Sequence, residues 1–109
     1  MALYETVFVT RQDLSEKQTK DLTEEMNKII ETNGGKVVNS EYWGLRTLAY
    51  QIKNNKKGHY TLFHIDGEPK AKDELERQLR QHDDILRFLS VRIDELPKEA
   101  SPLMKGEAA

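Results

Sequence analysis

The chain has no cysteine among its 109 residues, which excludes disulfides, thiolate nucleophiles and cysteine-ligated metals. Its first five residues carry no basic segment ahead of an apolar run, so we expect no secretory signal and no membrane span. Hydrophobic residues make up only 37% of the chain and charged residues 33%, which predicts one small core inside a charged shell. We expect a single domain over residues 1–96 and a flexible tail over residues 97–109.

Acidic residues are missing from one internal segment. Between Gly44 and Tyr60 there is no Asp or Glu, while the whole chain has a net charge of −2. The segment contains four cations, so the rest of the chain carries −6. These cations are Arg46, Lys53, Lys56 and Lys57. A basic stripe with interspersed aromatic residues on an acidic protein predicts a nucleic-acid contact. The alternative is a solvated hairpin whose lysines only deter edge-to-edge pairing.

Candidate catalytic residues are scarce. His59 and His64 differ in strand parity and so point to opposite faces of a sheet, and His82 is the only other histidine. The sequence contains no metalloprotease or nucleophile-elbow motif. Gly34-Gly35 follows a helix and precedes a strand, the reverse of a phosphate-binding glycine loop. We therefore expect no catalytic activity, no metal, no cofactor and no small-molecule substrate.

Six elements follow from the hydrophobic periodicity. Strands are predicted over residues 3–9, 36–52, 59–66 and 85–93. A capping box at Ser15 begins one helix and Pro69 suits the start of another. Gly44 predicts a bulge in the second strand, and residues 54–58 a lysine-bearing turn. The β-α-β-β-α-β order predicts an α+β, ferredoxin-like fold, with a four-stranded antiparallel sheet and both helices on one face.

The strands are apolar on both faces. In the third strand Phe63 and Leu62 point to opposite sides, whereas an antiparallel sheet with one solvated face usually alternates apolar with polar residues. We therefore predict that a partner covers the face without helices, and that Leu62→Asp leaves the fold largely intact. The predicted partner residues are Trp43, Tyr50, Tyr60, Leu62, Leu89 and Val91.

Several motifs together resemble bacterial small-subunit ribosomal protein six. They are Tyr4-Glu5, Gly34-Gly35, Trp43-Gly-Leu-Arg-Thr-Leu-Ala-Tyr-Gln-Ile52, Lys57-Gly-His-Tyr60 and Leu86-Arg-Phe-Leu89. The resemblance runs from about Leu3 to Ile93. It implies a non-catalytic structural protein of the cytoplasmic ribosome, which binds the central domain of small-subunit rRNA together with ribosomal protein eighteen.

The resemblance also assigns the RNA-binding residues. The matching basic positions are Arg46, Lys53, Arg80 and Arg87, with Lys56 and Lys57 as near matches. Thr47 occupies a position where a second basic residue is expected, which implies one phosphate contact fewer.

Three other functions remain open at this point. An RNA-recognition motif would place its stacking residues at His59 and Thr61, but threonine cannot stack on a base. A small-molecule-sensing domain of the same fold would need a ligand pocket. A pure protein-interaction module would bind its partner without RNA and without salt dependence.

Overall fold

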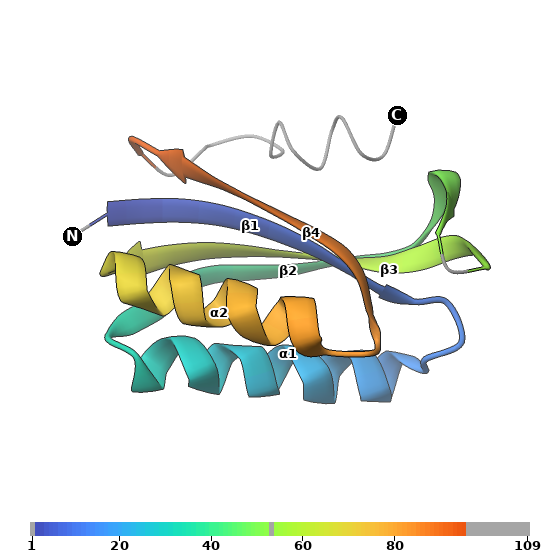
Figure 1. Ribbon diagram of the computed structural model, residues 1–109, viewed down its shortest axis with the longest axis horizontal. Helices are drawn as coiled ribbons and strands as arrows, with labels where there is room; N and C mark the ends of the chain where they lie inside the picture. Colours follow the sequence, from blue (N-terminus) through green and yellow to red (C-terminus); the bar gives the residue numbers. More distant parts are fainter. Residues whose placement is uncertain (1, 53, 96–109) are drawn as a thin grey trace.

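The computed structural model describes residues 2–52 and 54–95 (Figure 1). One antiparallel sheet in the order β2-β3-β1-β4 has both helices packed on one side. The ferredoxin-like prediction is therefore confirmed. The elements are β1 (Ala2–Arg11), α1 (Glu16–Thr32), β2 (Gly35–Ile52), β3 (Asn55–Gly67), α2 (Pro69–Gln81) and β4 (Ile85–Ile93). The predicted tail over 97–109 lies outside the described residues.

Both helices begin as the sequence predicts. The Ser15 backbone N–H donates to Gln18 Oε1 at 2.8 Å, and the Gln18 N–H donates to Ser15 Oγ at 3.1 Å. This capping box satisfies two N–H groups that α1 would otherwise leave unpaired. Pro69 occupies the first turn of α2, where its missing N–H costs nothing.

The helices bury one side of the sheet. Their apolar stripes form a first core cluster with strand residues on the same face of the sheet. Its aromatic centre is the Phe8–Phe63 pair, whose ring centroids lie 5.3 Å apart in a T-shaped arrangement. The cluster also contains Leu22, Met26, Ile30, Ile65, Leu75 and Leu79.

The β2–β3 hairpin is tighter than predicted. Ile52 pairs with Asn55, and Asn54 between them has φ 66°. Lys56 and Lys57 therefore belong to β3, and the prediction that they lie in a turn is wrong. No strand pattern is visible here in the sequence, because two lysines and a glycine interrupt the apolar residues. Lys53 lies outside the described residues.

Strand β2 departs from regular pairing at three places. Gly44, with φ 88°, adopts a conformation that suits glycine at one of them, so the predicted bulge is confirmed. Farther on, Thr47 is opposite Lys57 and Ile52 is opposite Asn55. Strand β2 therefore advances five residues while β3 advances two. We call the residues between these two pairs, 48–51, the β2 arch.

The β2 arch covers part of the face that has no helix. Leu48 is buried in a second core cluster that also contains Val9 of β1 and Leu86 of β4. Because β2 and β4 are opposite edges of the sheet, the hydrogen bond between Tyr50 of the arch and Arg87 of β4 requires β2 to bend over this face. Figure 1 shows the end of β2 rising from the sheet on the side away from the helices.

This coverage corrects two predicted partner residues. The parity assignment is right, because Tyr60 and Leu62 point away from the helices and join the second cluster. Their side chains are only 0% and 1% exposed, however. The expectation that Tyr60 and Leu62 form an open docking surface is wrong, because side chains of this chain already bury them.

Candidate RNA and protein contact surfaces

Arg46 is held in place by the bulge in β2. Its Nε donates to the Trp43 carbonyl at 3.1 Å, and its Cζ lies 4.9 Å from the centre of the Trp43 ring. Trp43 is half-buried and packs on the second core cluster, so the ring on which Arg46 lies is held in place. No carboxylate of the described residues lies within ion-pair distance of Arg46. Its two Nη groups are available as a fork for a phosphate.

Lys56 and Lys57 are exposed on opposite faces of β3, since successive residues of a strand alternate. Arg46 pairs with Gly58, which shares its face with Lys56. Lys57 points to the other face, and its backbone N–H donates to Gln12 Oε1 at 3.1 Å. The structure therefore brings Arg46 and Lys56 to one face and separates Lys57 from them.

The β2 arch also reaches Arg87. Arg87 Nη1 donates to the Tyr50 hydroxyl at 3.4 Å, which joins the end of β2 to β4. Leu89 and Val91 follow Arg87 on the same face and are 38% and 37% exposed, while Tyr50 is 64% exposed. Tyr50, Leu89 and Val91 form an exposed apolar strip on the face without helices.

Arg80 lies in the last turn of α2, with its Cζ 5.6 Å from the centre of the Phe88 ring. Arg80 and Arg87 line one cleft of about 280 Å³ between α2 and β4. No carboxylate of the residues in 2–52 and 54–95 forms an ion pair with Arg80. The contact with Phe88 was not predicted from the sequence, since nothing local signals that a helix end and the following strand will meet there.

Arg77 differs from Arg80 on the same helix. Its Nε donates to Glu74 Oε2 at 3.0 Å. Hydrogen bonds from Arg77 and then Gln78 lower the pKa of Glu74 to about 2. Arg77 is therefore paired with an acidic neighbour on this helix, whereas Arg80 is not paired with any carboxylate of the described residues.

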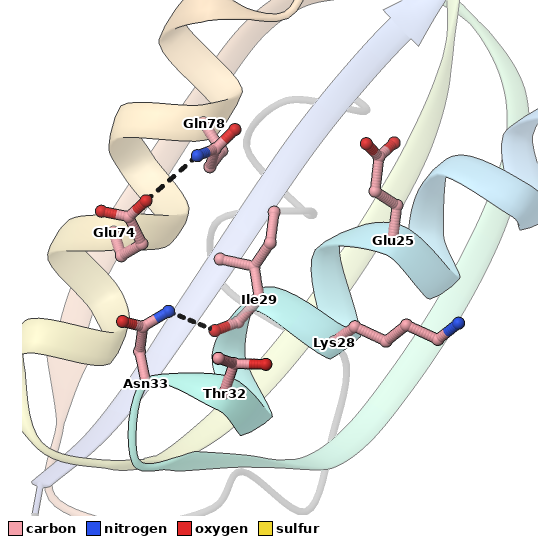
Figure 2. A pocket seen from close by; sticks show the side chains of 7 residues that line it. All are labelled: Glu25, Lys28, Ile29, Thr32, Asn33, Glu74 and Gln78. Carbon is pink, nitrogen blue, oxygen red and sulfur yellow. Dashed lines mark hydrogen bonds between the residues drawn. The ribbon is translucent and has the colours of Figure 1, made fainter.

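A second depression, of about 390 Å³, lies between α1 and α2 (Figure 2). Two of its polar side chains already have partners: Asn33 Nδ2 donates to the Ile29 carbonyl at 2.7 Å, and Gln78 Nε2 donates to Glu74 Oε1 at 3.0 Å. Two carboxylates and one lysine, from Glu25, Glu74 and Lys28, line it. This excess of negative charge does not favour binding of an anion. The depression therefore offers no support for the small-molecule-sensing alternative.

One buried polar network was not predicted from the sequence. Glu5 Oε1 and His64 Nε2 are 3.0 Å apart, and His64 Nδ1 is 3.2 Å from Asn39 Nδ2. Glu5 and His64 are 2% and 3% exposed. A single acidic residue inside an apolar strand was the available signal.

The His59 ring also has hydrogen-bond partners and is buried. Its ring contacts the Tyr42 hydroxyl at 2.7 Å and the Leu14 carbonyl at 2.8 Å, and it is 5% exposed. Thr61 is 1% exposed. Neither residue can stack on a base, so the RNA-recognition-motif alternative is wrong.

The described residues contain no cluster of three or more potential metal ligands. Within the same ranges, no helix has the length and apolar character needed to cross a lipid bilayer. The ferredoxin-like fold and the arginines at its surface define an α+β binding protein.

Comparison with known proteins identifies the family. The family model for ribosomal protein S6 matches residues 3–92, so the chain belongs to the ribosomal protein S6 family. It is 50% identical to small ribosomal subunit protein bS6 of Methylobacterium sp. (strain 4-46), over 96% of this chain and 78% of that one. It is 44% identical to the bS6 protein of Rickettsia bellii (strain RML369-C), over 99% and 90%.

A solved structure agrees with this assignment. The crystal structure of 30S ribosomal protein S6 from Thermotoga maritima matches with a TM-score of 0.80 and 31% identity, covering 84% of this chain and 87% of that one. Family membership confirms the predicted resemblance. It also confirms that the protein is located in the cytoplasmic ribosome and is not an enzyme.

Proposed function

We propose that the chain binds the central domain of small-subunit rRNA together with ribosomal protein eighteen. The observation that carries the proposal is Arg46, which is fixed on Trp43 and has no carboxylate partner within the described residues. An arginine held in this way loses little conformational entropy when its fork meets a phosphate. The proposed RNA-binding residues are Arg46, Lys53, Lys56, Lys57, Arg80 and Arg87.

Recognition through the phosphate backbone fits the distribution of these cations. Phosphate contacts fix register and orientation and carry no sequence information of their own. Arg87 bonds to Tyr50 of the β2 arch, on the strand that also carries Arg46.

The apolar strip of Tyr50, Leu89 and Val91 supports a protein partner on the face without helices. These side chains are exposed in this chain, and an exposed apolar patch beside charged residues is typical of a protein contact. Trp43 borders the same face and is half-buried. Tyr60 and Leu62 are left out of the proposed contact because they are buried.

Salt dependence tests the RNA contact. Neutralising about four phosphates predicts a slope of roughly −3 to −4 in a plot of log affinity against log salt, measured with the central-domain rRNA fragment and the partner protein present. Arg46→Ala should lower the magnitude of the slope by about one.

Arg77→Ala is the matched control, because Arg77 is already bound to Glu74. It should leave the affinity and the slope unchanged. A flat salt dependence in the wild-type protein, or equal losses from the two variants, would contradict the proposal.

A further inference from the structure

Tyr50 lies where the proposed protein contact and the proposed RNA contact meet. Its ring belongs to the exposed apolar strip, together with Leu89 and Val91. Its hydroxyl accepts a hydrogen bond from Arg87 Nη1 at 3.4 Å, and Arg87 is one of the proposed RNA-binding residues. One side chain of the β2 arch therefore contacts both surfaces.

Both surfaces are on the same face of the sheet. In the pairing of β4 with β1, Arg87 is opposite Val9. Leu89, two residues farther along β4, is opposite Val7. Both valines belong to the second core cluster, on the face without helices. A phosphate bound by Arg87 and a protein docked on the strip would therefore be neighbours.

The contact between Tyr50 and Arg87 is weak in the isolated chain. Tyr50 is 64% exposed, so water competes for its hydroxyl. The distance of 3.4 Å is also longer than the roughly 2.7–3.2 Å of most hydrogen bonds with a nitrogen donor. A protein docked on the strip would exclude this water, and a hydrogen bond from a charged donor is stronger in less polar surroundings. Covering Tyr50 would therefore hold the Arg87 guanidinium more firmly.

Arg46 does not depend on the arch in this way. Its Nε donates to the Trp43 carbonyl on its own strand, and its guanidinium lies over the Trp43 ring. Arg46 is therefore held in the isolated chain, whereas the printed contact of Arg87 is to an exposed side chain that the partner would cover.

We propose that Tyr50 is a positioning residue that couples partner binding to RNA binding. The partner covers Tyr50, the Tyr50 hydroxyl then holds Arg87 in one orientation, and Arg87 meets a phosphate with a smaller loss of conformational entropy. Because coupling free energies are reciprocal, bound RNA tightens the protein contact by the same factor. The inference rests on the proposed function and deepens it, because it names the residue through which the two contacts cooperate.

A double-mutant cycle tests the positioning role. Tyr50→Phe keeps the ring and removes only the hydroxyl. Affinity for the central-domain rRNA fragment is measured with ribosomal protein eighteen at saturating concentration, so that any loss of partner affinity does not enter. Tyr50→Phe should weaken RNA binding by about fivefold, the lower end of typical coupling between sites. In an Arg87→Ala background the same change should have no further effect beyond about twofold.

Arg46→Ala provides the matched background, because Arg46 is held by Trp43. The losses from Tyr50→Phe and Arg46→Ala should add, as they do for independent sites. A loss from Tyr50→Phe that is equally large in the Arg87→Ala background would mean that the hydroxyl acts elsewhere, and would overturn the positioning role. Since Tyr50 is exposed, Tyr50→Phe is expected to fold, which circular dichroism checks.

The dependence on the partner is tested without RNA. In protein labelled with ¹⁵N-arginine, the order parameter of the Arg87 Nε–H group reports how firmly the side chain is held. Adding ribosomal protein eighteen should raise it in the wild type and not in Tyr50→Phe, while the value for Arg46 should change little. An equal rise in both proteins, or no rise in the wild type, would overturn the coupling.

The outcomes separate this inference from the proposed function. If the wild-type protein and its partner bind the fragment with the expected salt slope, and Tyr50→Phe binds equally well, the coupling is wrong and the RNA contact stands. If the wild-type protein and its partner fail to bind the fragment, the proposed function is wrong and the coupling to RNA falls with it.

Discussion

Glu5 and His64 form a polar pair within the apolar face of the sheet that lacks helices. Removing one member of a buried hydrogen-bonded pair leaves the other without its partner, at a cost of about 1–3 kcal/mol. We expect His64→Ala to lower the free energy of unfolding by about this amount, measured by urea denaturation at neutral pH. Asn39 is exposed at the far end of the network, so Asn39→Ala should cost clearly less. Equal losses would mean that the Glu5–His64 contact adds nothing of its own.

Glu74 gives a residue-scale prediction for pH. Its pKa falls from 4.5 in the unfolded chain to about 2 in the folded protein, chiefly through the hydrogen bond from Arg77. A lowered pKa means stabilisation that is complete above about pH 4.5 and disappears as the pH falls through about 2.

The matching experiment is urea unfolding of the wild type and Glu74→Gln between about pH 2 and pH 7. The wild type should be the more stable protein at neutral pH, by a small amount because the pair is exposed. The difference should shrink steadily below about pH 4.5. A difference that does not vary with pH would rule out ionisation of Glu74 as its source.

At the scale of elements, the strands were predictable and the β2 arch was not. Gly44 indicated its bulge, because a glycine inside a strand commonly marks a bulge or a close backbone approach. The arch has no such local mark, since Leu48 leaves the β3 ladder and joins a buried cluster with Val9 and Leu86, which are distant in sequence. Packing between residues distant in sequence, and no local signal, therefore determines the course of residues 48–51, which include Tyr50.

Gly58 gives an element-scale prediction where β3 passes under the arch. A Cβ at this position would lie 2.3 Å from Val9 Cγ1 and 3.1 Å from the Thr10 carbonyl. Gly58→Ala should therefore destabilise the protein by about 1–3 kcal/mol through overpacking, measured by thermal and urea unfolding. Gly44→Asn is a suitable control, because open space surrounds Gly44 and asparagine tolerates positive φ. A larger loss from Gly44→Asn would argue against close packing as the cause.

For the whole molecule, the face of each residue in the regular strands β1 and β3 could be predicted from the sequence, but what covers that face could not. Parity is a local property, fixed by the two-residue repeat of a strand. Coverage depends on where β2 ends up after three register shifts. For this reason the sequence could not distinguish the exposed strip of Tyr50, Leu89 and Val91 from the buried second core cluster. Leu62 and Leu89 lie on the same face, yet only Leu62 is covered.

Leu62 and Leu89 provide a matched pair of variants. Leu62→Asp places a carboxylate in a site that is 1% exposed and should unfold the domain, which reverses the expectation drawn from sequence. Leu89→Asp, at a site 38% exposed, should remain folded and weaken binding to ribosomal protein eighteen. Circular dichroism and a pull-down with purified partner check the two results. A folded Leu62→Asp or an unfolded Leu89→Asp would contradict the burial of these two side chains.

The central position of β1 has a consequence for synthesis. β1 is made first, yet it lies between β3 and β4, and β4 spans residues 85–93 near the end of the described chain. A growing chain that has completed β3 still presents one bare side of β1, an open template for pairing with other chains. Ribosomes that stall before Ile85 would therefore release fragments prone to aggregation, and the sheet is completed only when β4, the last of the described strands, emerges.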